Sequence, residues 1–344
     1  MSKKFDVVIG NPPYQEEAQG AGTRDTPVYH LFMDAAYEAG RKAVLITPAR
    51  FLFNAGFTPK AWNAKMLADP HLSVSHFVPN SDDLFPGTDI KGGIAVTYRD
   101  DAVAGDPITT FASHPELNGI LQAVLTHHSA PLSSIITSGR AYSYTANMHT
   151  DNPQASARMS SDAQLRVSTN AFEQLPFLFT EHREGDRSDH VQVLGVLKNR
   201  RTKRWIRADY ITGPDSFQGF KVALPAANGT GKFGEVLSTP VPLGPGEAVT
   251  QTFITVGNFS SGAEAEACRR YIASKFARAL LSVLKITQHN PAKVWRYVPL
   301  QDFTAGSDLN WSRSIPQIDQ QLYSKYGLTA EQIDFIDTNV TPMD

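Results

Sequence analysis

The sequence has little that would mark a secreted or membrane-embedded protein. It contains a single cysteine, Cys268, among 344 residues, so no internal disulfide can form and a reducing compartment is favoured. No apolar run reaches the roughly 20 residues of a membrane-spanning helix. The first residues, Met1 to Lys4, lead directly into a short strand pattern and do not resemble a signal peptide. These absences predict a cytoplasmic protein.

Neither sign of charge dominates the chain. There are 32 Lys and Arg residues against 34 Asp and Glu, and the formal net charge is −2. Bulk charge therefore neither favours nor excludes a nucleic-acid partner, which would need a local basic patch. The histidines show no spacing with cysteine or carboxylates that is typical of a metal site, so no metal is predicted. There is no internal repeat and no low-complexity tract.

Residues 5 to about 100 follow an α/β pattern. An apolar strand over 5–10, a helix from Thr26 and Pro27 to Gly40, and a second strand over 42–47 predict a parallel crossover unit. The hydroxyl of Thr26 is expected to cap that helix, with Pro27 at its first position. A helix over 59–67, a strand over 71–78 and a return strand over 92–99 predict a closing antiparallel hairpin.

The rest of the chain is harder to interpret from patterns. We expect one helix near 115–127, short strands over 191–197, 219–224 and 252–256, a long amphipathic helix over 262–285 and two short helices within 315–339. The predicted segments are 1–105, a connecting stretch over 106–135, a larger region over 136–300 and a helical end over 301–344.

Directly after the first strand comes Asn11-Pro12-Pro13-Tyr14. The Asn11 amide oxygen and a neighbouring backbone carbonyl can accept the two hydrogens of an exocyclic amine, and the Tyr14 ring can stack on the base that carries it. The prolines hold the carbonyls in place, because each fixes its own φ and restricts the residue before it. The plain alternative is a proline-containing turn after a strand.

The segment from Phe5 to Tyr14 resembles the catalytic motif of the amino-group DNA methyltransferases, in its N6-adenine form. The resemblance is to gamma-type enzymes of type II, IIG-like restriction-modification systems. It implies S-adenosylmethionine as cofactor, double-stranded DNA as partner and a flipped target base. It also implies catalytic roles for Asn11, Pro12, Pro13 and Tyr14, and cofactor contacts for Asn11 and Asp6. The fold implied is the second half of a Rossmann-like methyltransferase sheet, followed by an α+β target-recognition domain over 136–300.

A flipped base has two faces to cover. Tyr14 is expected to stack on one, and Phe85, which precedes a Pro-containing hairpin loop as in the resembled family, on the other; the alternative for Phe85 is an ordinary core position. Arg50 can meet phosphate or substrate near the cleft, or be a solvated loop residue. Arg24 and Asp25 can close over the target nucleotide.

DNA contacts are predicted in the larger second region. The densest basic stretch surrounds Trp205, and inside a recognition domain it would neutralise phosphates, although such a stretch is more often a solvated face. Lys232 follows a Gly-rich segment that we interpret as a turn, not a phosphate loop. Gln288 and Asn290 can read base edges. The basic residues are Lys198, Arg200, Arg201, Lys203, Arg204 and Arg207.

The family's Gly-rich cofactor turn is expected ahead of Asn11, where only ten residues stand. Three explanations stay open: a truncated chain, a partner that supplies the cofactor half, or a non-catalytic DNA-binding or specificity subunit built on such an enzyme. A sheet lacking its first strands would expose an edge, so self-association or a partner chain is predicted there. Methylation of a protein or RNA is a weaker alternative, because the large C-terminal region favours DNA.

Overall fold

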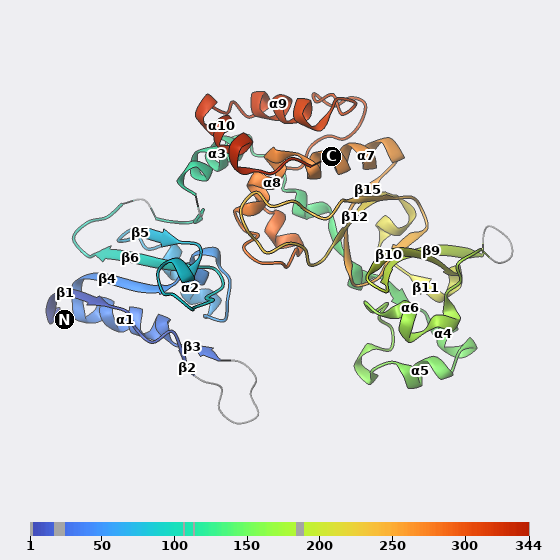
Figure 1. The fold of residues 1–344 in the computed structure, drawn as a ribbon, viewed down its shortest axis with the longest axis horizontal. Coiled ribbons are helices and arrows are strands. Elements are labelled where there is room, and N and C mark those ends of the chain that lie inside the picture. Colours follow the sequence, from blue (N-terminus) through green and yellow to red (C-terminus); the bar gives the residue numbers. More distant parts are fainter. Residues whose placement is uncertain (1–2, 17–24, 106, 113, 184–188, 344) are drawn as a thin grey trace. The chain divides into compact units, whose positions relative to one another are not determined.

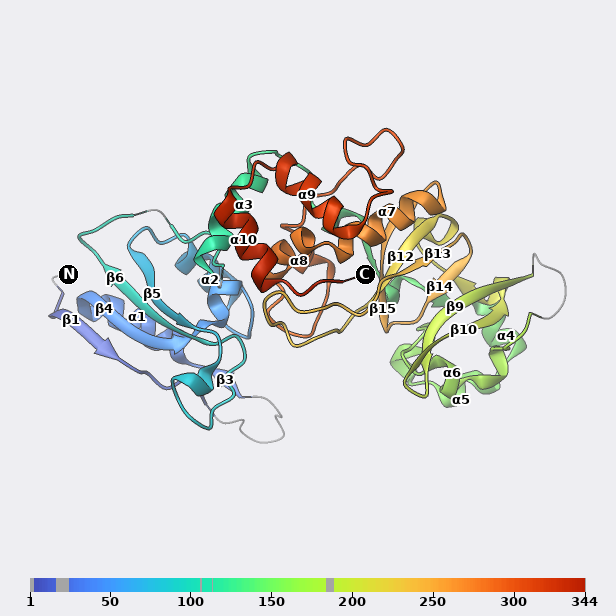
Figure 2. The same cartoon turned by 45° about the horizontal axis from the view of Figure 1, so that its top comes forward.

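The computed structural model describes residues 3–16, 25–105, 107–112, 114–183 and 189–343. The chain divides into two compact units, 1–118 and 119–344, and both mix helices with strands (Figures 1 and 2). An α/β chain was expected and is confirmed. The loop with Arg24, expected near the catalytic motif, lies outside the described residues.

One sheet organises the first unit. Its strand order is β1-β4-β6-β5, with β1 and β4 parallel and β6 antiparallel to both of its neighbours. The predicted antiparallel pairing of 71–78 with 92–99 is confirmed, and the later strand lies between β4 and β5. The bounds are β1 Phe5–Gly10, β4 Gly40–Pro48, β5 Leu72–Val78 and β6 Ile94–Asp100.

Helix α1 (Tyr29–Ala39) connects the parallel strands, and Figure 1 shows it running beside β1 and β4. It ends at Gly40, as predicted. Its start differs from the prediction: Thr26 and Pro27 form β3, which pairs with β2 (Gln15–Glu16), so Val28 and not Thr26 stands at the N-cap. A short turn of 3-10 helix (Ala49–Phe53) follows β4, and α2 (Lys60–Leu67) comes next, close to the predicted range.

The two faces of this sheet differ in burial. On the face that meets α1, Ala43 and Leu45 of β4 and Thr97 of β6 are buried, and the guanidinium of Arg99 lies 5.0 Å from the ring centroid of Tyr37 in α1. On the other face, Val44 and Ile46 of β4 and Val96 and Tyr98 of β6 are only half-buried. The edge strand β1 exposes three apolar side chains. Those are Phe5 (51% exposed), Val7 (47%) and Ile9 (76%).

The second unit contains two larger sheets with helices around them. Their orders are β10-β9-β14 and β13-β12-β15-β7, and a two-stranded pair joins β11 to β8. The strands expected over 191–197, 219–224 and 252–256 are present as β9, β12 and β15. The bounds are β7 Ile136–Ser138, β8 Ser143–Tyr144, β9 His190–Leu197, β10 Arg200–Arg207, β11 Ile211–Thr212, β12 Phe220–Pro225, β13 Val241–Leu243, β14 Glu247–Val249 and β15 Phe253–Phe259.

The helices expected near 115–127 and within 315–339 are present, whereas α4, α5 and α6 were not predicted. The single helix predicted over 262–285 is two, because Ser274 takes an extended conformation (φ −60°, ψ 148°) and its hydroxyl accepts a hydrogen bond from Ala277 N at 3.1 Å. Helix α3 spans the division between the units. The bounds are α3 Pro115–Leu125, α4 Ala146–Asp151, α5 Gln154–Arg158, α6 Ala171–Gln174, α7 Gly262–Ala273, α8 Lys275–Ser282, α9 Ile315–Lys325 and α10 Ala330–Asn339.

Two expected absences can be compared with the described residues. None of their helices is both long and apolar enough to cross a membrane. Nor do the described side chains include a group of three or more His, Cys, Asp or Glu residues placed to hold a metal ion. Cys268 is buried and unpaired.

Candidate active site

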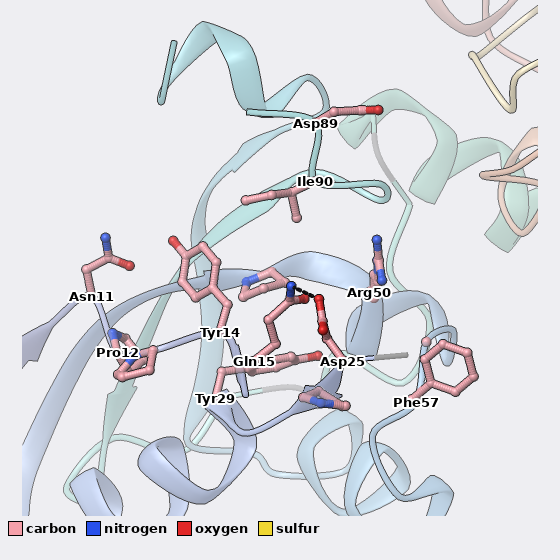
Figure 3. A pocket seen from close by; sticks show the side chains of 14 residues that line it. Asn11, Pro12, Tyr14, Gln15, Asp25, Tyr29, Arg50, Phe57, Asp89 and Ile90 are labelled. Atoms are coloured by element: carbon pink, nitrogen blue, oxygen red, sulfur yellow. Dashed lines mark hydrogen bonds between the residues drawn. The ribbon is translucent and has the colours of Figure 1, made fainter. Parts of the chain in front are cut away.

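A pocket of about 530 Å³ opens where β1 and β4 end (Figure 3). Because the strands are parallel, the residues after their carboxyl ends meet at one edge of the sheet, the usual place for ligands in α/β folds. All of Asn11, Pro12, Pro13 and Tyr14 line it, so the structure brings the whole predicted motif to one cavity. The other lining residues are Gln15, Asp25, Pro27, Tyr29, Pro48, Arg50, Gly56, Phe57, Asp89 and Ile90.

Asn11 and Tyr14 are presented differently. Asn11 is exposed, whereas Tyr14 is half-buried and its backbone carbonyl accepts a 3.1 Å hydrogen bond from Val28 N, which ties the motif to the start of α1. The Tyr14 hydroxyl lies beside the Asn11 side chain, although no hydrogen bond of standard geometry joins it to the described residues. Burial raises the pKa of Tyr14, so its hydroxyl stays neutral at physiological pH. The motif therefore presents an amide and a neutral ring to a ligand.

Tyr29 forms part of the wall, and sequence reasoning did not single it out. Its ring is buried, with centroids 6.4 Å from Phe51 and 6.3 Å from Trp62. Burial raises the pKa of Tyr29 to about 12. Its position as the first residue of α1, on the side of the helix facing the sheet, looks in sequence like any core position. In the folded chain, the start of α1 lies beside the residues that follow β1, and Tyr29 therefore borders the motif.

The rim carries charge and one exposed ring. Phe57 is 65% exposed. Asp25 accepts a 2.6 Å hydrogen bond from Gln15 Nε2, and Asp89 forms a 2.8 Å ion pair with Lys91. Arg50 also faces the pocket, which favours the substrate-contact interpretation of this residue over that of a solvated loop arginine.

Asp6 and Phe85 are placed away from this group. Asp6 is exposed and is the second residue of β1, at the end of the strand away from Asn11. It lies 3.7 Å from Arg41 in an ion pair and does not line the pocket. Phe85 is half-buried in the turn before β6 and is not among the lining residues, whereas Asp89 and Ile90 from the same connection are. The base-stacking and cofactor assignments of these two residues are thus without support from the pocket.

The predicted basic cluster forms β10, and much of its charge is already paired. Lys203 pairs with Glu247, Arg204 with Glu181, and Arg207 with both Asp151 and Asp209. Arg201 donates to the Thr239 carbonyl, and burial lowers its pKa. Lys198 and Arg200 are exposed at the β9–β10 turn, where Lys198 and Asn199 have positive φ values of 47° and 60°. The hairpin tip therefore carries exposed charge, and Arg201 and Arg207 of β10 are exposed as well.

The remaining predicted DNA contacts separate into exposed and buried residues. Lys232 and Gln288 are exposed. Asn290 is buried: its Oδ1 accepts from Trp295 Nε1 at 2.8 Å and its Nδ2 donates to the Pro225 carbonyl at 3.4 Å. Both ends of its amide are thus hydrogen-bonded inside the protein. Asn290 is therefore unsuited to reading a base edge, and the structure does not support that prediction.

The Gly-rich segment before Lys232 closes on the protein itself. The Glu235 carboxylate accepts from Thr230 N at 2.7 Å and Gly231 N at 2.9 Å, and it also pairs with Lys285 at 2.6 Å. The backbone N–H groups that a phosphate would use are thus satisfied by a carboxylate. The segment is a turn, as expected, and leaves only the Lys232 side chain for a phosphate contact.

An exposed amide, proline-fixed carbonyls and an aromatic ring at the carboxyl ends of parallel strands suit a planar base held by its amine. Residues 1–85 match the Eco57I restriction-modification methylase family. A curated relative from Mycoplasma pneumoniae (strain ATCC 29342 / M129 / Subtype 1), an uncharacterized adenine-specific methylase, is 32% identical over 95 residues, which cover 26% of this chain and 22% of that protein.

These similarities are local. The chain spans about a fifth of the length of the curated relative that it matches. The family match falls within the first unit and contains the whole Asn11–Tyr14 motif, whereas the connection with Asp89 and Ile90 and strand β6 follow it. The family match supports a restriction-modification methylase, and the name of the curated relative points to adenine.

Proposed function

We propose that the chain takes part in site-specific N6-methylation of adenine in DNA, with S-adenosylmethionine as methyl donor, in a gamma-type, IIG-like restriction-modification system of the cytoplasm. In this proposal the first unit is the second half of the methyltransferase sheet and the region 136–300 recognises the target. The observation that carries it is the pocket that gathers all of Asn11, Pro12, Pro13 and Tyr14, in the part of the chain similar to restriction-modification methylases.

The residues act on the acceptor amine. An adenine amine is a poor nucleophile, because its lone pair is delocalised into the ring. The Asn11 Oδ1 and the Pro12 carbonyl accept its two hydrogens, which localises the lone pair and stabilises the positive charge that grows on nitrogen during transfer. Tyr14 stacks on the base, which must leave the duplex to reach the pocket. No protein nucleophile is needed, and burial raises the pKa of the Cys268 thiol, so that it stays unreactive.

When bound, S-adenosylmethionine supplies an electrophilic methyl group. The residues present fit this cofactor incompletely. Asn11 borders the pocket, but Asp6 is paired with Arg41 outside it, and no Gly-rich turn precedes Asn11 in the sequence. No cofactor geometry follows from these residues. We infer that the remaining cofactor contacts come from an element outside the described residues, which can pair with the edge of β1 that no described strand covers.

DNA is the proposed partner of the second unit. The exposed members of the predicted contact set include Lys198 and Arg200 at the tip of the β9–β10 hairpin, and Lys232 and Gln288 nearer the end of the chain. Lys203, Arg204 and Arg207 remain proposed contacts. Each is already paired with a carboxylate of the protein, so a phosphate would have to compete with that carboxylate. Phe85 remains the proposed second stacking residue, which requires movement of the turn before β6.

The test is transfer of a labelled methyl group from S-adenosylmethionine to mixed-sequence, unmethylated DNA, with Asn11→Ala as the control. The proposal expects transfer that disappears in Asn11→Ala, while DNA affinity stays within severalfold. Unchanged transfer by the variant would refute the assignment of Asn11. If neither protein transfers methyl groups, the assay is repeated with candidate partner chains, and failure with every partner removes the catalytic proposal.

A second candidate function is supported by the same incomplete cofactor site. A chain whose Asp6 lies away from the pocket and whose β1 edge is free can serve as a non-catalytic DNA-binding or specificity subunit, or be a remnant that needs a partner. Calorimetry with S-adenosylmethionine separates the two. Binding by the chain alone favours the enzyme, and DNA binding without cofactor binding favours the subunit.

A further inference from the structure

Arg50 is a cation built into the wall of the pocket. It lies in the short 3-10 turn that follows β4, and its neighbours Ala49, Phe51 and Leu52 are buried. The turn is therefore fixed by packing on three of its positions. Arg50 is the residue of this turn that lines the cavity.

Two glycines make room for the stem of this side chain. Gly56 and Gly92 have φ values of 81° and 89°, which side chains rarely adopt. A Cβ placed on Gly56 would lie 3.2 Å from Arg50 Cδ, and one on Gly92 would lie 2.9 Å from Arg50 Cγ. The Arg50 Nε donates to the backbone carbonyl of Lys91. The side chain is thus held up to Nε, and the terminal Nη groups are left for a ligand.

The Arg50 guanidinium has no acidic partner within the described part of the chain. Arg99, by contrast, pairs with Asp69 and Asp101. The acidic residues beside the pocket are engaged elsewhere, Asp25 with Gln15 and Asp89 with Lys91. A positioned guanidinium without a carboxylate is suited to an external oxyanion, which it can grip through two parallel N–H groups.

The position of Arg50 indicates which oxyanion this is. Figure 3 shows Asn11 at one end of the pocket, Arg50 towards the other, and Tyr14 between them. In adenine the exocyclic amine and the nitrogen that carries the sugar lie on opposite sides of the ring system. A base whose amine reaches Asn11 and whose ring stacks on Tyr14 therefore directs its sugar and phosphate away from Asn11, towards Arg50.

We propose that Arg50 binds the phosphate of the nucleotide whose adenine enters the pocket, and so positions the base for Asn11. The proposal rests on the proposed adenine methylation. The same oxyanion chemistry is offered by the carboxylate of the methyl donor, and the experiment separates the two sources.

The experiment compares four proteins by calorimetry or ligand-observed NMR: the natural chain, Arg50→Gln, Arg50→Lys and Lys65→Gln. The last removes one charge from α2, where Lys65 pairs with Asp34, and serves as the matched control. The probes are deoxyadenosine, its 5′- and 3′-monophosphates, deoxycytidine, S-adenosylmethionine and decarboxylated S-adenosylmethionine. Thermal melting of each variant checks folding, since glutamine keeps most of the stem between Gly56 and Gly92.

The natural chain is expected to bind one of the monophosphates roughly tenfold or more tightly than deoxyadenosine. Arg50→Gln removes that preference without changing deoxyadenosine affinity, Arg50→Lys keeps part of it, and Lys65→Gln keeps all of it. An undiminished phosphate preference in Arg50→Gln overturns the proposal. So does a loss of affinity by that variant for S-adenosylmethionine but not for its decarboxylated form, which identifies the donor carboxylate as the ligand.

A failure of the proposed adenine methylation would give a different binding result from a failure of the role of Arg50. If the natural chain binds deoxycytidine as well as deoxyadenosine, the pocket does not select adenine. The proposed methylation of adenine then fails, and the role of Arg50 fails with it. A pocket that selects adenine but ignores Arg50 leaves the proposed function intact.

Discussion

The functional argument rests on single residues, above all on the Asn11–Tyr14 motif that lines the pocket. The Asn11–Tyr14 motif could be identified from sequence because the chemistry depends on adjacent residues, and proline fixes their backbone. Tyr29, Phe57 and Ile90 could not be found in this way, because they reach the pocket only through the fold. Asp6 and Phe85 were assigned by likeness to a family, and the geometry of the pocket does not include them.

Tyr14 gives a test at this scale. Tyr14→Phe keeps the ring and removes a neutral hydroxyl, so methyl transfer is expected to stay within a few-fold of the natural chain. Tyr14→Ala removes the stacking surface, and base–aromatic stacking is worth about 1–3 kcal/mol, so kcat/KM is expected to fall roughly tenfold to a hundredfold. Single-turnover methylation of DNA measures both. Equal losses in the two variants would show that the hydroxyl, and not the ring, is what matters.

At the scale of elements, periodicity located most strands and helices but not their interruptions. The break between α7 and α8 was missed because apolar residues continue at helical spacing through Ser274. Besides the Ser274 hydroxyl, a residue from far along the chain caps the start of α8: the Asp319 carboxylate in α9 accepts hydrogen bonds from Lys275 N at 3.1 Å and Phe276 N at 2.9 Å. The partner of a cap cannot be read from local sequence when it comes from another helix.

That cap predicts a pH dependence. Burial raises the pKa of Asp319 from 3.8 to about 6, despite the two N–H donors and the nearby Arg278. The folded state therefore binds the proton of the Asp319 carboxyl more tightly than the unfolded state does. The contribution of protonated Asp319 to the free energy of unfolding is present at low pH and is lost as pH rises from about 4 to about 6. We subtract the free energy of unfolding of Asp319→Asn from that of the natural chain. This difference is expected to be about 2 kcal/mol more favourable to the natural chain at pH 4 than at pH 7.

Denaturant unfolding at the two pH values measures this difference. The exposed residue Asp334 of α10 supplies the control Asp334→Asn, which changes the same chemical group outside the cap. Taking differences between proteins cancels the opposing titration of carboxyls such as Glu235 and Glu266, whose pKa values are lowered by their cationic partners despite burial. A difference that stays constant with pH would mean that Asp319 titrates normally in the folded chain.

Across the whole molecule, the uncovered side of the first unit's sheet stands out. Among the described strands, β1 pairs only with β4, and the apolar side chains of Phe5, Val7 and Ile9 are exposed on one face. Local sequence did not predict this exposed face, because an apolar strand has the same composition when both of its faces are buried.

Self-association through this edge is therefore expected for the isolated chain at micromolar concentration, by sedimentation velocity. Ile9→Lys should return it to a monomer, because a lysine on an edge strand opposes pairing, and should leave stability within about 0.5 kcal/mol. Leu31→Lys, on an exposed position of α1, is the matched control and should still associate. A natural chain that sediments as a clean monomer would contradict the expectation.

The place of β6 has a consequence for the order in which the first unit is made. Strand β5 meets β4 only through β6, the last strand of the sheet to be synthesised. Until residues 94–100 have left the ribosome, β5 has no neighbour to pair with, and the parallel pair β1–β4 stands alone. Residues 1–85, which match the methylase family, therefore lack the strand that joins β5 to the rest of the sheet. An expression fragment that ends there would hold the catalytic motif on a sheet missing its central strand, and a fragment ending after Asp100 is the shortest that can complete it.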